Sequence, residues 1–296
     1  MKLSVSMITF QGAAYLKAQM DSILGQSLPV HEIIVFDDGS TDGTREILAD
    51  YAAAHPQIKL QFNTENLGTV ANMQQCLRLT TGDIIFLADQ DDVWLPNKVE
   101  KTLAFFEQNP TAEAVFSNAD IIDETGETQF GMTLWDIIGF PFGKVELGDF
   151  ETRVDNVVTG AGLAMKRDAK LLAMDIPQQA GLLHDGWIGL YFAAKNALMA
   201  NPETLFQYRS HANQQVGGKI AERSQLLDFN LALYDGVPVM KDFKTWRESM
   251  KRLYTNLTLP YMQTEKIQEQ IDLYAEYGMT YFQLRASLFL FMKAIR

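Results

Sequence analysis

Short apolar runs alternate with amphipathic segments through the first 120 residues, and no other feature of the sequence restricts the fold as much. The apolar runs are rich in Val, Ile and Phe and are bounded by turn residues, which is typical of strands. The segments between them carry apolar residues at helical spacing. Strands that alternate with helices predict a parallel, doubly wound α/β sheet with helices on both faces. The expected strands are residues 3–9, 32–37, 58–62, 83–88 and 114–117, and the expected helices are 13–24, 44–54, 70–79 and 97–107.

The alternation is lost in the middle of the chain. Residues 130–158 contain Gly, Pro and aromatic residues without a clear period. A long irregular segment inside a domain often carries function. Trp135 and the Phe residues in this segment could stack on a ligand, or they could belong to the core.

Regular structure is expected again after this segment. The sequence predicts a strand over 162–166, a helix that starts near Asp185 and strand-like pieces over 197–209. The residues that follow read as helices. The predicted organisation is therefore a first domain over 1–218 and a helical C-terminal extension over 219–296.

Composition excludes several classes of protein. Of the 296 residues, 47% are hydrophobic and 21% are charged, which is typical of a folded globular protein and not of a disordered or fibrous one. The formal net charge is −12, and so acidic a chain lacks the basic surface that neutralises nucleic-acid phosphates. We therefore expect no nucleic-acid partner. A ligand that carries phosphates would need a bound cation to lie beside the carboxylates.

Cysteine content and hydropathy predict the compartment. Cys76 is the single cysteine, so no internal disulfide can form, and its apolar neighbours favour a buried structural thiol. The first residues do not resemble a secretory signal, and no run approaches the roughly 18 apolar residues of a spanning helix. These features predict a cytoplasmic protein. Residues 241–296 hold nine Lys or Arg and six Asp or Glu, and this basic, apolar region could rest on the inner face of the cell membrane. Packing on the domain, or on a partner subunit in a homo-oligomer, is the favoured interpretation.

Three aspartates in four residues follow an expected strand, in the run Asp89-Gln90-Asp91-Asp92. In an extended segment, residues two apart point the same way, so Asp89 and Asp91 can present two carboxylates to one site. Mg²⁺ and Mn²⁺ prefer oxygen ligands, and Mg²⁺ often takes one or two carboxylates while substrate phosphates complete its shell. A calcium loop of the EF-hand type needs Gly at the sixth position, where this chain has Trp94. A helix-capping turn needs only one aspartate, so the repulsion among three favours a bound cation.

A second polar run extends from Asp37 to Thr44, directly after another expected strand. Its two glycines permit a tight turn, and its Ser and Thr residues can cap the next helix, whose amide groups favour an anion. Taken alone, this run is typical of a strand-to-helix turn. Ligands of doubly wound sheets bind at the carboxyl ends of the strands, so Asp38 and Asp91 are expected on the same rim. Asp38 could accept a hydrogen bond from a nucleotide base there.

Four segments, taken in order, resemble glycosyltransferase family 2, a large inverting family with the GT-A fold. The resemblance is closest to its bacterial polysaccharide and rhamnosyltransferase-like members, and it covers roughly residues 1–215. It implies a Rossmann-like, mostly parallel sheet that binds a nucleotide-diphosphate sugar. The ordered set is far more specific than any single piece. The four segments are Ser4–Phe10, Ile34–Ser40, Asn66–Gly68 and Ala88–Pro96.

The resemblance implies roles in binding the donor. Thr9, Asp38 and Asn66 match positions that hold the nucleotide, and Asp89 matches an aspartate near the ribose and diphosphate. Asp91 matches the metal-binding carboxylate of the family's Asp-any-Asp motif. The implied cofactor is Mg²⁺ or Mn²⁺.

The resemblance also implies a catalytic base. The segment that contains His184, Asp185 and Trp187 is similar to the one that supplies this base, which makes Asp185 the candidate. Many members have Glu before this aspartate, where the present chain has His184. Both His184 and Trp187 are expected near the sugar or the acceptor.

Two further sites are implied with alternatives left open. His211 lies in a run similar to a late segment that closes over the diphosphate, and it could be a third metal ligand or a packing residue. Gly160 and Gly162 would let the backbone approach the sugar closely, or they could form a simple bend.

Together these features predict an inverting, metal-dependent enzyme that moves a sugar from a UDP- or dTDP-sugar to a glycan or lipid-linked acceptor in bacterial cell-surface polysaccharide synthesis. The cation would offset charge on the leaving diphosphate while a carboxylate takes the proton of the acceptor hydroxyl. One alternative is a non-catalytic scaffold that binds a nucleotide sugar. A sugar nucleotidyltransferase is less favoured, because residues 10–14 do not form a Gly-rich loop with a basic residue.

Overall fold

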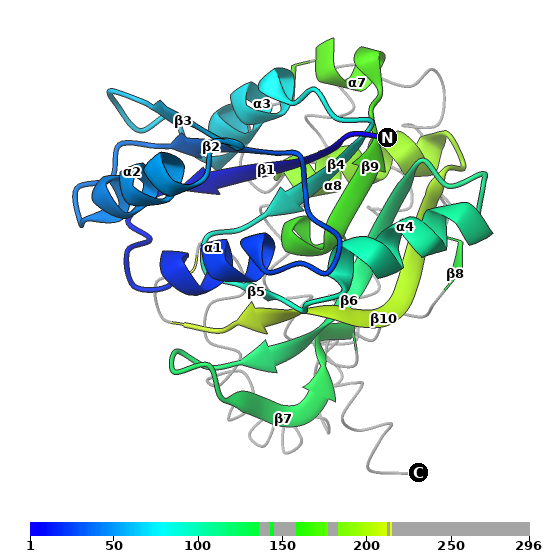
Figure 1. The fold of residues 1–296 in the computed structure, drawn as a ribbon. Helices are drawn as coiled ribbons and strands as arrows, with labels where there is room; N and C mark the ends of the chain where they lie inside the picture. The colour runs from blue at the N-terminus through cyan, green and yellow to red at the C-terminus, as the bar shows by residue number, and fades with distance from the viewer. Residues whose placement is uncertain (136–142, 145–157, 174, 177–182, 212–213, 215–296) are drawn as a thin grey trace, which may run out of the picture.

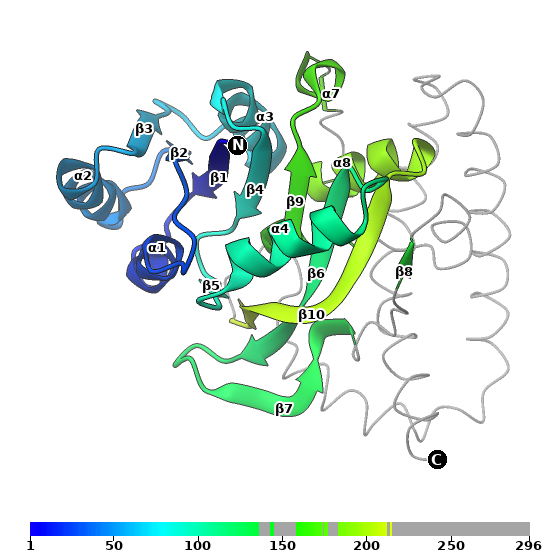
Figure 2. The same ribbon diagram turned by 45° about the vertical axis from the view of Figure 1, so that its right-hand side comes forward.

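The computed structural model describes residues 1–135, 143–144, 158–173, 175–176, 183–211 and 214. It has the predicted α/β architecture, a ten-stranded mixed sheet with helices on both faces (Figures 1 and 2). Within these residues, no helix combines the length and the apolar character needed to cross a membrane. The expected helical extension over 219–296, with its membrane or subunit contacts, lies outside the described residues.

The elements follow the predicted alternation closely in the first half of the chain. They are β1 (Leu3–Thr9), α1 (Leu16–Leu24), β2 (Glu32–Asp37), α2 (Thr44–Ala54), β3 (Ile58–Phe62), α3 (Thr69–Leu79), β4 (Ile84–Ala88), β5 (Val93–Trp94) and α4 (Lys98–Gln108). The second half adds more antiparallel pairing. Its elements are β6 (Ala114–Ile122), β7 (Thr128–Thr133), β8 (Gly143–Lys144), the 3-10 turn η1 (Gly160–Gly162), β9 (Leu163–Lys166), α7 (Ala169–Ala173), α8 (His184–Ala194) and β10 (Leu198–Arg209).

Strand β1 lies between β2 and β4, and the three strands run parallel. The register pairs Thr9 with Asp37 and Met7 with Ala88, so the polar residues after each strand emerge at one edge, which we call the carboxyl edge. The strand order is β3-β2-β1-β4-β9-β6-β10-β5, with β7 beside β6 and β8 beside β10. Strand β9 is antiparallel to β4 and β6, and β10 is parallel to β6. Strand β10 therefore also ends at the carboxyl edge.

Helices cover both faces of the sheet. Helix α3 packs on β1 and β2 and contacts α7 and α8, whereas α1 contacts α2 and β5, and α4 contacts β10. In Figure 1, α1 and α4 lie in front of the sheet and α8 lies behind it. Because β4 is covered on both sides, all five of its residues are buried and apolar.

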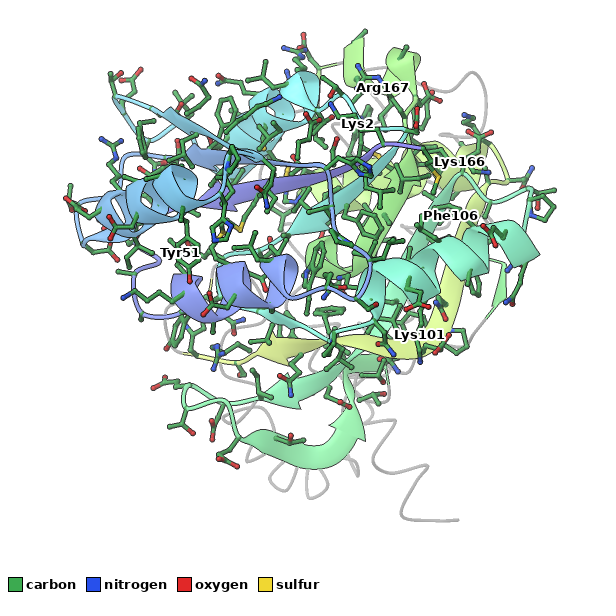
Figure 3. All side chains as sticks on the ribbon, in the orientation of Figure 1. Lys2, Tyr51, Lys101, Phe106, Lys166 and Arg167 are labelled. Carbon is green, nitrogen blue, oxygen red and sulfur yellow. The ribbon has the colours of Figure 1, made fainter. Side chains whose placement is uncertain are left out.

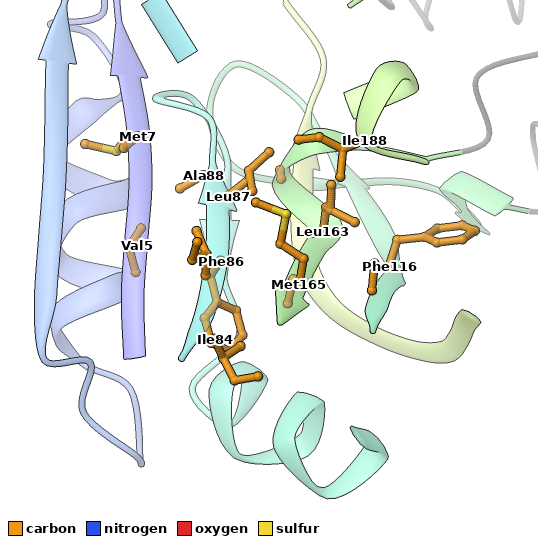
Figure 4. Close-up of a cluster of buried hydrophobic side chains, with 14 of the residues drawn as sticks. Val5, Met7, Ile84, Phe86, Leu87, Ala88, Phe116, Leu163, Met165 and Ile188 are labelled. Carbon is orange, nitrogen blue, oxygen red and sulfur yellow. The ribbon is translucent and has the colours of Figure 1, made fainter. Parts of the chain in front are cut away.

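The core is centred on β1, β4 and β9. Figure 4 shows Val5 and Met7 of β1 beside the side chains of β4, with Leu163 and Met165 of β9 and Ile188 of α8 on the other side. These residues, those of β4 included, are at most 4% exposed. A single continuous core therefore runs from the predicted parallel half into the later strands.

Strands β5, β7 and β8 were not predicted, and β6 is longer than predicted. Strand β6, expected to end at Ser117, continues to Ile122 because its next apolar side chains are buried as well. A tight turn then leads into β7, in which Asp123 Oδ1 accepts hydrogen bonds from the Thr125 and Glu127 N–H groups, and Gly126 has a φ of 92°. Residues up to Thr133, placed in the irregular segment by the sequence analysis, therefore form a strand.

Trp135 belongs to the core. Its side chain is 1% exposed, and its ring lies 5.4 Å from the ring of Phe116, centroid to centroid. Of the two interpretations left open for this tryptophan, core packing is correct. The other aromatic residues of this segment beyond Trp135 lie outside the described residues.

Glu32 is a buried carboxylate at the opposite edge of the sheet. It accepts hydrogen bonds from Ser4 Oγ at 2.6 Å and from the Nζ atoms of Lys2 and Lys59, each at 3.1 Å; Lys2 is labelled in Figure 3. Burial alone would raise the pKa of Glu32, but the hydrogen bonds from Ser4, Thr81 and Lys2 outweigh it and hold the pKa well below its usual value.

We expect Glu32→Gln to lower the free energy of unfolding at pH 7 by about 2 kcal/mol, because hydrogen bonds to a charged group are lost. A folded-state pKa below the unfolded value means that the contribution is complete above about pH 4.3 and is lost as the pH falls toward the folded value. The difference between wild type and E32Q, measured by urea unfolding, should therefore shrink below about pH 4. Glu107→Gln, at an exposed position of α4, is the control. An equal difference in unfolding free energy between wild type and E32Q at pH 7 and below about pH 4 would contradict the lowered pKa of Glu32.

Candidate active site

Gln90 joins the ends of β1 and β4 at the carboxyl edge. Its Oε1 accepts a hydrogen bond from the Phe10 N–H at 2.8 Å, and its Nε2 donates to the Phe10 carbonyl at 2.9 Å. The side chain runs so close to Gly12 that a Cβ there would lie 2.1 Å from Gln90 Oε1. The cross-link formed by the Gln90–Phe10 hydrogen bonds therefore requires glycine at residue 12. The sequence analysis did not identify this contact.

Asp37 organises the turn after β2. Its Oδ2 accepts hydrogen bonds from Thr9 Oγ1 at 3.0 Å and Ser40 Oγ at 2.5 Å, and its Oδ1 accepts from Arg45 Nε at 2.6 Å. The Arg45 guanidinium also lies 5.2 Å above the centre of the Phe62 ring. The hydroxyl of Thr9, expected at the nucleotide, is thus bonded to Asp37, and Thr9 is 2% exposed. The Asp-x-x-Ser spacing was the available signal for this role of Asp37.

Asp38 anchors the loop between β3 and α3. Its carboxylate accepts hydrogen bonds from Asn63 Nδ2 at 2.8 Å and from the N–H groups of Leu67 and Gly68, each at 2.9 Å. Asn66 is exposed, and its Oδ1 accepts from Gly68 N–H at 3.0 Å. Asp38 and Asn66, predicted to share a site, are therefore brought together through one loop.

The aspartate loop, residues 89–92, is held by the end of β10. Arg209 Nε donates to the Asp91 carbonyl at 2.7 Å, and the Arg209 N–H donates to Asp92 Oδ1 at 2.9 Å. His211 Nε2 lies 2.9 Å from Asp91 Oδ2. The two residues matched to metal ligands, far apart in sequence, are therefore adjacent.

Tyr15 packs beside this contact. Its ring centre lies 4.7 Å from the centre of the His211 ring and 4.9 Å from the Arg209 guanidinium carbon. Because Tyr15 precedes α1, this contact connects the end of β1 to the end of β10. Sequence reasoning did not identify Tyr15 or the part played by Arg209.

Two carboxylates of the aspartate loop, Asp89 and Asp92, have raised pKa values. Burial and the neighbouring negative charge of Asp91 raise the pKa of Asp89 to about 6, and burial with the same charge raises the pKa of Asp92 well above its usual value. Burial lowers the pKa of Lys98 to about 7, although Asp92 and Asp89 favour its charged form. A divalent cation would favour the charged carboxylates.

Asp185 and His184 meet the aspartate loop at Gly160. Asp185 Oδ2 accepts the Gly160 N–H at 3.1 Å, and its Oδ1 accepts the Gly186 N–H at 2.7 Å. A Cβ on Gly160 would lie 3.3 Å from His184 Nε2, 3.6 Å from Asp89 Oδ2 and 3.7 Å from Asp185 Cβ. The absence of a side chain at Gly160 thus lets these three residues surround one backbone position.

The two remaining predicted residues pack closely. A Cβ on Gly162 would lie 2.9 Å from the Ser117 carbonyl oxygen, so this glycine allows η1 to approach β6. Trp187 is 5% exposed and belongs to the core.

His184 is 3% exposed, and neither ring nitrogen has a hydrogen-bond partner among the described residues. Burial lowers the pKa of His184 although Asp89 raises it, which favours the neutral imidazole.

The residues fit a cation that is only partly coordinated by protein. Asp91 and His211 offer an oxygen and a nitrogen within 2.9 Å of each other, a donor pair that suits Mn²⁺ or, through the carboxylate, Mg²⁺. In the part of the chain that the structure describes, no group of three or more His, Cys, Asp or Glu residues could hold a metal by itself. Phosphate oxygens of a ligand would therefore complete the shell.

The sequence model of glycosyl transferase family 2 matches residues 4–170. EpsE of Bacillus subtilis (strain 168), provisionally named a glycosyltransferase, is 38% identical over 126 residues, which are 42% of this chain and 45% of EpsE. TuaG of the same organism, provisionally named a teichuronic acid biosynthesis glycosyltransferase, is 36% identical over 110 residues, 36% of this chain and 44% of TuaG. The uncharacterised protein Rv1520 of Mycobacterium tuberculosis is 26% identical over 217 residues, 71% of this chain and 59% of Rv1520. The matched part spans about half the length of these relatives.

Solved structures share the fold. The mannosyltransferase PcManGT from Pyrobaculum calidifontis, in complex with GDP-Man and Mn²⁺, aligns with a TM-score of 0.55 and 18% identity over 99% of this chain and 75% of that one. Residues 1–349 of S. aureus TarS, in complex with UDP-GlcNAc, align with a TM-score of 0.59 and 13% identity over 98% of this chain and 90% of that one. The α/β architecture is therefore that of GT-A glycosyltransferases.

We expect Gly12→Ala to displace Gln90 and to lower the free energy of unfolding by about 1–2 kcal/mol, because the two hydrogen bonds to Phe10 are lost. Gln90→Ala removes the same bonds. The effect of G12A, measured by urea unfolding, should therefore be much smaller in the Q90A background than in the wild type. Additive effects of the two substitutions would show that Gly12 serves another purpose.

Proposed function

This chain belongs to glycosyl transferase family 2, and from that premise we propose that it transfers a sugar, with inversion, from a UDP- or dTDP-sugar to a glycan or lipid-linked acceptor in bacterial cell-surface polysaccharide synthesis. The observation that carries the proposal is the meeting of Asp89, His184 and Asp185 around Gly160, beside the Asp91–His211 pair. The name of TuaG, which refers to teichuronic acid biosynthesis, supports a role in polysaccharide synthesis.

The nucleotide is proposed to bind where β1, β2 and the loop after β3 end. Asp38 fixes the backbone of Leu67 and Gly68, which leaves Asn66 exposed beside it. Thr9 acts in this proposal through its bond to Asp37 and through its carbonyl, which accepts the Asp38 N–H at 2.8 Å. Thr9 is then a support of the nucleotide site and not a direct contact.

Asp91 and His211 would hold Mg²⁺ or Mn²⁺. When bound, the cation supplies positive charge that offsets charge on the departing diphosphate. Arg209 keeps the Asp91 backbone in place, and Asp89 would lie beside the sugar and the diphosphate. His211 as a ligand is supported by the 2.9 Å separation between its Nε2 and Asp91 Oδ2.

Asp185 is the proposed base. The acceptor hydroxyl oxygen forms a bond to the anomeric carbon, the bond from that carbon to the diphosphate breaks, and the hydroxyl proton passes to Asp185. The Gly160 N–H donates to one carboxylate oxygen and the Gly186 N–H to the other, so the side chain is oriented before the acceptor arrives. Displacement in a single step inverts the anomeric configuration.

His184 is proposed to contact a substrate hydroxyl. Its two ring nitrogens are buried without a hydrogen-bond partner among the described residues, and a hydroxyl can donate to one or accept from the other. Trp187 packs in the core and would support His184 without touching the acceptor. A non-catalytic nucleotide-sugar scaffold is the alternative function, since fold alone does not establish turnover.

A panel of UDP-, dTDP- and GDP-sugars, each tested with Mn²⁺ and with EDTA, distinguishes a glycosyltransferase from a non-catalytic scaffold. We expect release of the nucleoside diphosphate from a UDP- or dTDP-sugar only when the cation is present. Asp91→Asn should weaken binding of Mn²⁺–UDP by about 10–100-fold, because a charged ligand is lost. Asp50→Asn, at an exposed position of α2, is the matched control. Binding without turnover of any donor would favour the scaffold.

Asp185→Asn should lower kcat by about 10²–10⁴-fold, because the neutral amide cannot take the proton. The substitution keeps the size of the side chain, so calorimetric binding of Mn²⁺–UDP should stay close to that of the wild type. Turnover by D185N at the wild-type rate would refute the assignment of the base.

A further inference from the structure

Lys98, the first residue of α4, is a buried basic residue to which the proposed reaction assigns no role. Its side chain is 1% exposed, and Nζ donates a hydrogen bond to the carbonyl of Ala161. Nζ also lies 4.4 Å from the centre of the Trp94 ring and 4.6 Å from that of the Phe206 ring. Within the described residues, it has no carboxylate partner at ion-pair distance.

A lysine at such a position is costly. Removal of an ammonium group from water is unfavourable unless new contacts compensate. The other buried positions of α4 are filled by Val99, Thr102, Leu103 and Phe106, and an apolar side chain at residue 98 would pack without that cost. The carbonyl and the two aromatic faces offset part of it. A buried lysine that the packing of α4 does not require indicates a role in the candidate active site.

The three contacts of Nζ belong to different parts of the site. Ala161 lies in η1, directly after Gly160, whose N–H donates to Asp185. Trp94 follows the aspartate loop in β5. Phe206 lies in β10, three residues before Arg209, which binds the aspartate loop.

The 3-10 turn η1 leaves little room for rearrangement around Lys98 Nζ. Gly162 approaches the Phe206 ring so closely that a Cβ there would lie 3.0 Å from a ring carbon. Lys98 and Phe206 thus contact η1 at neighbouring residues. Whether Nζ is charged or neutral, it retains an N–H group for the Ala161 carbonyl.

We propose that Lys98 is a positioning residue for sugar transfer: by binding Ala161 it fixes η1, and through the Gly160 N–H it sets the orientation of the proposed base Asp185 relative to the aspartate loop. This inference rests on the proposed function. It differs from a role in stability alone, which would reduce the amount of folded enzyme but leave the folded enzyme with normal turnover.

The test compares Lys98→Met, which keeps the length of the side chain but removes every N–H group, with Lys98→Arg, which retains them. Lys101→Met is the matched control, since Lys101 lies one turn further along α4, is 41% exposed and pairs with Glu203 (Figure 3). Hydrogen exchange of the peptide that contains residues 160–162 reports on η1. Calorimetry with Mn²⁺–UDP reports on the donor site, and kcat is measured with the donor that the wild type uses.

We expect K98M to exchange faster at residues 160–162, to bind Mn²⁺–UDP with wild-type stoichiometry and nearly wild-type affinity, and to lose about 10²-fold in kcat, as for a misplaced catalytic group. K98R should recover part of the protection from exchange at residues 160–162 and part of kcat, and K101M should resemble the wild type in both. Normal kcat and normal exchange in K98M would overturn the inference.

Phe206→Leu keeps the experiment decisive if K98M does not fold. It removes one of the two rings beside Nζ but retains an apolar side chain, so it should show the same two effects to a smaller extent. Unchanged exchange and kcat in F206L would then overturn the inference. A wild-type protein that uses no donor in the panel would instead overturn the proposed function, and the two failures are therefore distinguishable.

Discussion

The parallel pairing of β1 with β2 on one side and β4 on the other determines where every polar loop of the site lies. Because Thr9 is level with Asp37 and Met7 with Ala88, the residues after these strands leave the sheet at the same edge. Strand β9 runs antiparallel to both of its neighbours, β4 and β6, so β6 and β10 have the same direction as β1. The carboxyl edge can therefore collect groups that are almost two hundred residues apart in the chain.

The negative charges of the aspartates at the carboxyl edge are stabilised by different kinds of contact. Asp37 forms an ion pair with the Arg45 guanidinium group, Asp38 accepts hydrogen bonds from backbone N–H groups, and Asp91 lies against His211. Burial and the neighbouring charge of Asp91 raise the pKa values of Asp89 and Asp92. A cation bound at the aspartate loop would therefore stabilise the charged forms of these two carboxylates.

Local patterns predicted the elements, and the strand order of a doubly wound sheet predicted the shared edge of Asp38 and Asp91. What the sequence could not indicate depends on contacts between distant segments. Among the described strands, β7 pairs with β6 alone, and the sequence of β7 by itself does not predict this pairing. The cross-link from Gln90 to Phe10 and the burial of Lys98 likewise depend on segments about 60 to 80 residues away. The proposed boundary at residue 218 and the helices after it lie outside the described part of the chain.

Strand β10 is irregular where it passes β6, with shifts in register between Asn201 and Thr204 and again between Thr204 and Phe206. Side chains alternate between the two faces of a strand, so a change of one residue in length would turn everything after it to the opposite face. Arg209 and His211 would then point away from Asp91 while the strand itself could still form. Insertions and deletions in this stretch should therefore survive among related chains only when they preserve the direction in which these two residues point.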